Sequence, residues 1–270
     1  MDSEIGSVDE TGLSNLRAEW HERFPNSPSA MLEYGVAWDV ITTILGREWL
    51  VRNLPHASRD PYLRVADEEG TLEAFIHQAR VTQLAQHLFE AQPVENFAPM
   101  ARKLRGRSLV GAAAELRVAH LFCVNGRRFR FVVPSGERGS DYDLVVTYEA
   151  AEVAVEIKTK DDETPYRRKS FERTLSKAVS QLPVQGPGVA IVHVPRSWPV
   201  DATFAREAEG LVADALRRSR RLNGIVAVWE QWLTLLPTGY VCAVKFRIFE
   251  NPDPKTPVEK LLVLLREIDG

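Results

Sequence analysis

The first hundred residues carry apolar side chains at helical spacing, three or four residues apart. The stretch 30–50 is apolar with this period and has few helix breakers. A second stretch, 71–91, repeats the pattern, and a shorter helix is expected over 94–104. We therefore predict an all-helical N-terminal domain that covers residues 1–105.

The start of this domain, residues 1–27, is acidic and polar. Leu13, Leu16, Trp20 and Phe24 have helical spacing, but we interpret the segment as a flexible or loosely packed lead-in. It lacks the basic and apolar stretches of a secretory signal. Since no run of about 18 apolar residues occurs anywhere, we expect a soluble, cytoplasmic protein with no membrane segment.

The pattern changes after Arg107. Ser108 is a plausible N-cap for a helix that runs to Val124, where Asn125-Gly126 stops it. The further elements expected are strands at 128–133, 143–148 and 152–159, a helix at 168–182, a strand at 188–194, a helix at 202–220 and strands at 225–232 and 240–246. This order predicts an α/β domain over 106–270, with a mixed β-sheet flanked by helices.

The strand 152–159 holds two charged residues in apolar surroundings. Side chains alternate along a strand, so Glu156 and Lys158 share one face with Ala154. Burying two charges in a sheet is costly unless they pair or hold a metal ion. The alternative is an ordinary ion pair on an exposed face.

The preceding strand adds carboxylates. Asp143 precedes Glu156 by 13 residues, and in a tight hairpin the start of the first strand lies beside the end of the second. Two neighbouring carboxylates repel unless a cation lies between them, and oxygen ligands suit Mg²⁺ or Mn²⁺. Asp141 is a second candidate. Alternatively, Ser140-Asp141-Tyr142-Asp143 forms a turn whose aspartates cap backbone groups.

A third acid lies in the helix 108–124. Ala112, Glu115, Ala119 and Phe122 form one helical stripe, so Glu115 lies on an apolar face of small residues that can approach a sheet closely. The alternative is a glutamate whose charge is satisfied by a nearby arginine.

This combination resembles the PD-(D/E)XK nuclease superfamily, which has the restriction-endonuclease-like fold. The resemblance rests on Glu115 in a helix, Ser140-Asp141-Tyr142-Asp143-Leu144 at the head of a strand, and Glu156-Ile157-Lys158 on the next strand. It covers about residues 108–195. In that family a helix with its acid precedes a three-strand meander, and a helix and a further strand follow.

The resemblance implies catalytic roles for four residues. Asp143 and Glu156 would hold one or two Mg²⁺ (or Mn²⁺) ions, Lys158 would help to activate the attacking water, and Glu115 would complete the metal shell. Ser140-Asp141 stands where the family has Pro-Asp, which leaves Asp141 open as the metal ligand. The implied function is a Mg²⁺-dependent endonuclease that acts on DNA, with defence against foreign DNA as a setting. Two alternatives stay open: a non-cutting nucleic-acid-binding or assembly subunit with the same fold, and a nuclease for RNA or branched DNA.

Charge is unevenly distributed. The whole chain has a net charge of −3, yet residues 101–180 hold 16 Lys and Arg against 11 Asp and Glu. We predict nucleic-acid contacts from the basic residues that follow the acids, with a solvated helix face as the alternative. These residues are Lys160, Arg167, Arg168, Lys169, Arg173 and Lys177, with Gln181 as a possible accessory.

Other chemistry finds little support in the sequence. The chain has no glycine-rich phosphate loop, so ATP or NAD use is not indicated. Cys123 and Cys242 are interpreted as reduced cysteines, and no histidines have metal-ligand spacing, so core or surface roles are favoured for them. The helical domain could recognise substrate or a protein partner, and cutting both DNA strands would favour a homodimer.

Overall fold

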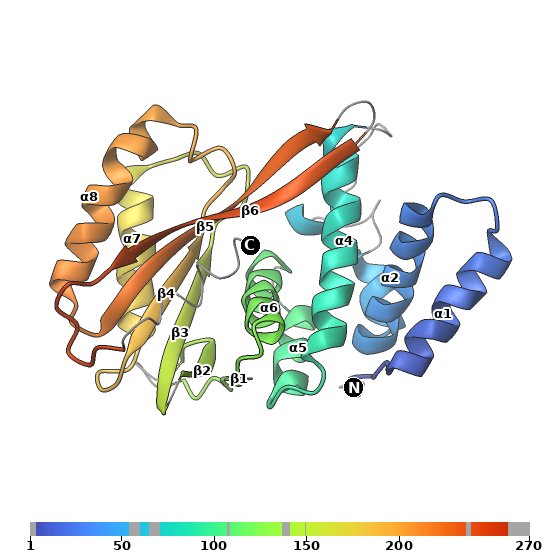
Figure 1. The fold of residues 1–270 in the computed structure, drawn as a ribbon, viewed down its shortest axis with the longest axis horizontal. Coiled ribbons are helices and arrows are strands. Elements are labelled where there is room, and N and C mark those ends of the chain that lie inside the picture. The colour runs from blue at the N-terminus through green and yellow to red at the C-terminus, as the bar shows by residue number, and fades with distance from the viewer. Residues whose placement is uncertain are drawn as a thin grey trace. The chain divides into compact units, whose positions relative to one another are not determined.

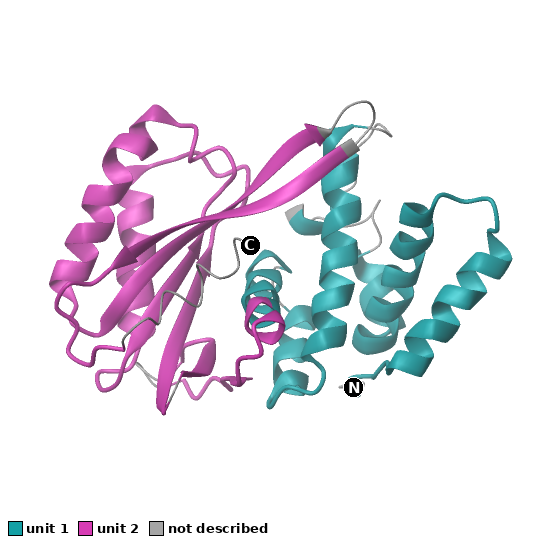
Figure 2. Cartoon of the chain, in the orientation of Figure 1, with its two compact units in different colours: residues 1–120 teal, residues 121–270 magenta. Residues whose placement is uncertain are grey.

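The computed structural model describes residues 4–53, 60–64, 71–106, 109–136, 141–148, 150–235 and 239–258. The chain divides into two compact units, residues 1–120 and 121–270 (Figure 2). The sequence pattern favours a boundary at 105/106, whereas this division falls inside a helix, Leu109–Val124.

The described elements of unit 1, residues 1–120, are all helices. Its elements are α1 (Glu10–Arg23), α2 (Ser29–Leu45), α3 (Arg47–Asn53), the short 3-10 helix η1 (Pro61–Leu63), α4 (Leu72–Ala91), α5 (Phe97–Gly106) and most of α6 (Leu109–Val124) (Figure 1). The helices predicted at 71–91 and 94–104 are α4 and α5. Across the described residues of the whole chain, no helix combines the length and apolarity that crossing a bilayer demands.

The segment predicted to be a flexible or loosely packed lead-in contains a regular helix, α1, although no residue of this helix is buried. The Asp9 carboxylate caps this helix by accepting the N–H of Gly12 at 2.7 Å. Trp20 holds α1 on α2: its indole N–H donates to Asp39 at 2.6 Å, and a Cβ at Gly35 would come within 2.5 Å of its ring. The Trp20 ring can therefore pack against α2 because Gly35 has no side chain.

The single helix predicted over 30–50 is in fact two helices. Gly46 separates α2 from α3 with φ of +90°, a conformation that side chains disfavour, and its N–H donates to Thr42 O at 2.8 Å. The start of α6 also differs from prediction. Ser108 lies outside the described residues, and the Leu109 N–H donates to the Asp60 carboxylate at 2.8 Å.

Unit 2, residues 121–270, is a mixed α/β unit. Its elements are β1 (Phe129–Phe131), β2 (Leu144–Tyr148), β3 (Ala151–Thr159), α7 (Arg168–Gln181), β4 (Gly188–His193), α8 (Ala202–Arg218), β5 (Leu222–Leu235) and β6 (Gly239–Glu250). Among the described residues they form one open six-stranded sheet in the order β1-β2-β3-β4-β5-β6. The predicted order of elements is confirmed, and so is the antiparallel hairpin of β2 and β3.

The sheet is mixed. The antiparallel meander β1-β2-β3 is followed by β4 and β5, which run parallel to β3, and by the antiparallel edge strand β6. Strands β5 and β6 are longer than predicted, because β5 pairs with β4 only as far as Val228 and then continues with β6 as a two-stranded ribbon.

Helices α7 and α8 cover one face of the sheet (Figure 1). Their apolar residues and the facing strand residues form one buried cluster, which includes Ala154 of β3, Phe171 and Leu175 of α7, and Val192 of β4. Because Ala154, Glu156 and Lys158 alternate onto the same face of β3, this packing places the two charged residues on the side of the sheet that α7 covers.

Candidate functional site

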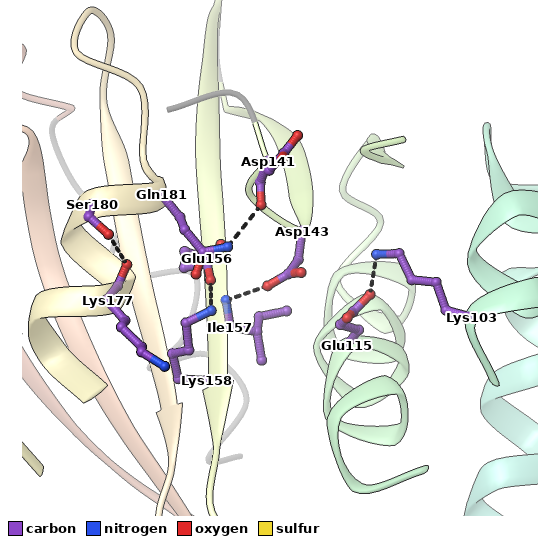
Figure 3. A network of polar contacts seen from close by, with 10 residues as sticks. All are labelled: Lys103, Glu115, Asp141, Asp143, Glu156, Ile157, Lys158, Lys177, Ser180 and Gln181. Atoms are coloured by element: carbon purple, nitrogen blue, oxygen red, sulfur yellow. Dashed lines mark hydrogen bonds and ion pairs between the residues drawn. The ribbon is translucent and has the colours of Figure 1, made fainter. Parts of the chain in front are cut away.

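Glu156 and Lys158 lie side by side on β3, as the two-residue period of a strand predicts. The Glu156 side chain has no exposed surface, and Lys158 Nζ donates to its Oε1 (Figure 3). The Lys158 side chain is 22% exposed. A carboxylate in such a dry place is costly to bury and needs a cation beside it. The ordinary surface ion pair that the sequence left open is therefore excluded.

Asp143 lies at the start of β2 and is bonded to the backbone on both sides of Glu156. Its N–H donates to Val155 O at 3.1 Å, and its carboxylate Oδ2 accepts the N–H of Ile157 at 2.8 Å (Figure 3). The structure thus brings Asp143 to the same end of the β2-β3 hairpin as Glu156 and Lys158. A carboxylate has about four lone-pair sites, so this bond is compatible with cation binding.

Asp141 has a different set of contacts. Its carboxylate Oδ1 accepts the N–H and the hydroxyl of Ser135, at 2.7 and 3.0 Å, and the N–H of Gly136 at 3.1 Å. Gly136 has φ of +80°, a turn conformation that favours glycine. Asp141 therefore caps a turn, as the alternative interpretation of this segment expects. Ser140 lies outside the described residues.

Glu115 belongs to unit 1, where it is also paired. Its carboxylate accepts Lys103 Nζ of α5 at 3.1 Å, and the two side chains are 13% and 15% exposed, respectively. The predicted stripe of small and apolar neighbours is real, since Ala112, Ala119 and Phe122 are buried. The lysine takes the place of the arginine that the alternative interpretation expects, and the role of Glu115 at a metal stays a prediction.

The basic residues predicted to bind nucleic acid lie just before α7 and within it. Lys160, in the loop before the helix, is half-buried. Its ammonium group donates to the Ser170 hydroxyl at 3.2 Å, within the protein itself. The other five are exposed: Arg167, Arg168, Lys169, Arg173 and Lys177. Arg168 is paired with Glu172 at 3.1 Å, one turn along the helix.

Three of these cations stand at four-residue intervals, at Lys169, Arg173 and Lys177, and the next position in the series is Gln181. Gln181 Nε2 donates to the backbone carbonyl of Asp141 at 3.2 Å. In Figure 3 the Lys177 side chain points toward Lys158. The cationic stripe therefore ends beside the segment that carries Asp141 and Asp143.

The donor set is suited to a hard divalent cation. Asp143 and Glu156 bring two carboxylates to one end of a hairpin, and Mg²⁺ is commonly held by one or two carboxylates together with water and phosphate oxygens. No cluster of three or more His, Cys, Asp or Glu side chains is assembled within the part of the chain that the structure describes. A cation here would rest on two protein carboxylates and complete its shell from water or substrate.

Contacts between distant segments were missed by sequence reasoning. His87 and His120 stack at 4.5 Å between ring centroids, and Glu90 pairs with His120 Nδ1. Burial, together with His120 and Arg117, holds the pKa of His87 well below its usual value. Because α4 and α6 bring these histidines together, their spacing in the sequence gives no signal.

The loop after Lys158 is also held by side chains that the sequence does not single out. The Trp198 indole donates to Thr164 O at 2.7 Å, and the Tyr166 hydroxyl donates to Glu207 of α8 at 3.0 Å. Burial and the neighbouring Glu207 carboxylate raise the pKa of Tyr166 to about 12. These bonds fix the chain between β3 and α7, the two elements that carry the candidate site.

No protein-family model, no curated protein and no solved structure matches this chain. Function is therefore inferred from the chemistry of the side chains and from the order of the elements that carry them.

Proposed function

We propose that residues 106–270 form a metal-dependent nuclease domain of the PD-(D/E)XK type that hydrolyses phosphodiester bonds in DNA. One observation carries the proposal: a fully buried glutamate, Glu156, is paired with Lys158 on the same strand while Asp143 bonds to the backbone on either side of it. This is the set of two acids and one amine that such chemistry needs, and it is held on strands that pack into a rigid core.

The order of the elements supports the restriction-endonuclease-like fold. Helix α6 precedes the antiparallel meander β1-β2-β3, and α7 and the parallel strand β4 follow. The family resembled by the sequence has the same succession of helix, three-strand meander, helix and strand. Asp143 directly precedes β2 and the Glu-x-Lys sequence lies on β3, which agrees with the positions that the resemblance implies.

Asp143 and Glu156 are the residues that would hold a Mg²⁺ or Mn²⁺ ion. When bound, such an ion lowers the pKa of a coordinated water and neutralises charge on the phosphate oxygens. Lys158 would place an ammonium donor beside the attacked phosphate, at a position fixed by its bond to Glu156. Burial of Glu156 keeps bulk water from competing for its carboxylate.

The exposed cations of α7 are the proposed substrate contacts. Phosphate groups are bound through charge and position the nucleic acid without reading its sequence. Lys169, Arg173 and Lys177 offer three cations at successive turns, and the last of them points toward Lys158 (Figure 3). A phosphate backbone bound along the helix would then lie close to Asp143 and Glu156.

The test is binding and cleavage of supercoiled plasmid, single-stranded DNA, branched DNA and single-stranded RNA with Mg²⁺, Mn²⁺ or EDTA, together with calorimetry of Mn²⁺ binding. Wild type is compared with Asp143→Asn, Glu156→Gln and Lys158→Met, which we expect to lose at least about 100-fold in rate. Glu152→Gln is the matched control, because Glu152 lies on the same strand but is 62% exposed and pairs with Arg130. It is expected to cut like wild type.

The outcomes separate the three functions that the sequence leaves open. Cleavage of RNA alone, or of branched DNA alone, would replace the DNA substrate while keeping the site. Binding of DNA and Mn²⁺ without cleavage would favour the assembly subunit. Cleavage that persists in EDTA, or in the Glu156→Gln variant, would contradict the nuclease site proposed here.

A further inference from the structure

The sequence leaves open whether Asp141 or Asp143 is the metal ligand, and the two aspartates have different contacts in the structure. We propose that Asp141 is a positioning residue that holds Asp143 in place and is not a ligand of the cation. What Asp143 does once it is held rests on the proposed function. The positioning itself rests only on hydrogen bonds within unit 2.

The Asp141 carboxylate binds two residues that precede it by five and six positions. The three donors on its Oδ1 come from Ser135 and Gly136, which lie on the far side of residues 137–140 in the sequence. Two of these donors are backbone N–H groups, for which an aspartate oxygen is a common partner in turns. Asp141 thus ties the segment that leaves β1 to the segment that enters β2.

A second bond ties the same residue to α7. Gln181 Nε2 donates to the Asp141 carbonyl, and α7 is itself anchored in the core by Phe171, Leu175 and Ala178. Between the two aspartates, Tyr142 packs against the same apolar cluster. The backbone just before Asp143 is therefore held by Ser135 and Gly136, by helix α7 and by the core.

The consequence reaches Asp143 through only two peptide links. Its carboxylate accepts the Ile157 N–H at 2.8 Å, a bond that depends on where the start of β2 lies. If Asp141 loses its bonds, the start of β2 gains freedom and this bond opens. The Ile157 amide is accordingly a reporter of the position of Asp143.

The decisive comparison is Asp141→Asn against Asp141→Ala and Asp143→Asn. An asparagine Oδ1 accepts the same N–H bonds but lacks the negative charge that a cation ligand supplies. We expect Asp141→Asn to keep Mn²⁺ affinity and cleavage rate within about threefold of wild type. Asp141→Ala should lose about 10- to 100-fold, as supporting residues around a metal ligand do, and Asp143→Asn at least as much. Asp141→Asn as defective as Asp143→Asn would overturn the proposal.

A readout that needs neither metal nor substrate keeps the two proposals apart. Hydrogen exchange at the Ile157 amide, measured in the full chain at one pH, should quicken about tenfold in Asp141→Ala and in Gln181→Ala. The exchange rate should be unchanged in Asp141→Asn and in Ser180→Ala. Ser180 is the control because its hydroxyl donates within its own helix, to Lys177 O at 2.8 Å. Unchanged exchange in Asp141→Ala would defeat the positioning role even in an active enzyme. If wild type neither binds Mn²⁺ nor cleaves nucleic acid, the proposed nuclease function is wrong. The exchange rate of the Ile157 amide would still decide whether Asp141 positions Asp143.

Discussion

Each compact unit pairs a poorly exposed glutamate with a lysine, and the two pairs differ in how much water reaches them. In unit 1, Glu115 of α6 and Lys103 of α5 are 13% and 15% exposed. In unit 2, Glu156 has no exposed surface, and Lys158 is 22% exposed. The first pair joins two helices, whereas the second joins two residues of a single strand.

The difference is consistent with a stabilising role for the first pair and with the catalytic role proposed for the second. Two helices gain a link from Lys103 and Glu115, but a strand gains no link from residues two apart on its own face. A dry carboxylate costs free energy that apolar side chains of similar size would not. Unit 1 also buries two imidazoles, those of His77 and His87, and burial holds their pKa values below the usual value, so that they stay neutral.

The largest predicted effect comes from removing the lysine of each pair. Lys158→Met should lower the free energy of unfolding by about 3–5 kcal/mol, because a carboxylate without exposed surface loses its ammonium. Lys103→Met should cost about 1.5–3 kcal/mol, since water can still reach Glu115. Urea unfolding of the full chain at pH 7 measures both.

The double replacement sharpens this comparison. Glu156→Leu combined with Lys158→Met removes both charges and should bring stability back to within about 1 kcal/mol of wild type or above it. The double variant should still lack the cleavage activity proposed for wild type. If stability does not return, the Glu156–Lys158 pair contributes to the fold in its own right, and the distinction between the two units is wrong.

A smaller effect follows from the neutral histidines of unit 1. His87 has a folded-state pKa well below 6.5, so below about pH 6.5 the unfolded chain takes up a proton that the native state does not. Stability should therefore fall as pH drops from 6.5, by at most about 1.4 kcal/mol per pH unit for this residue. His87→Gln should flatten the dependence between pH 6.5 and 5.5, and His21→Gln, on the exposed surface of α1, should leave it unchanged. An equal slope in all three proteins would contradict this origin of the pH dependence.

Local sequence patterns predicted most of the fold, because the periodic apolar segments are bounded by residues typical of turns and helix caps. The strands β2 and β3 are bounded by turns, and α8 begins at Asp201, whose carboxylate caps the helix. The pattern failed for α1, which has no buried residue, so its apolar spacing was too weak an indication. The cap at Asp9 was the available signal. It also failed at Gly46, since a sequence does not state the φ of a glycine.

The candidate site was predictable only as far as strand alternation extends. Alternation places Glu156 beside Lys158, and the short hairpin connection brings Asp143 to them. It could not decide between Asp143 and Asp141, because that depends on the N–H groups around each carboxylate. Those of Ser135 and Gly136 reach Asp141 through a turn that the pattern does not specify. Likewise, the Lys103 partner of Glu115 comes from another helix.

The smallest predicted effect concerns an acid–base pair of unit 2 that water reaches freely. Glu152 of β3 is 62% exposed, and its bond to Arg130 of β1 holds the pKa of the carboxyl below its usual value. Its contribution is thus present above the unfolded-state pKa and is lost as pH falls through the lowered folded value. Glu152→Gln should cost at most about 1 kcal/mol at pH 7 in low salt, and the cost should vanish in about 1 M salt, where screening acts within about 3 Å. Glu152 shares its strand with Glu156, so a loss near that of Lys158→Met would mean that the strand, and not the dryness of the carboxylate, sets the cost.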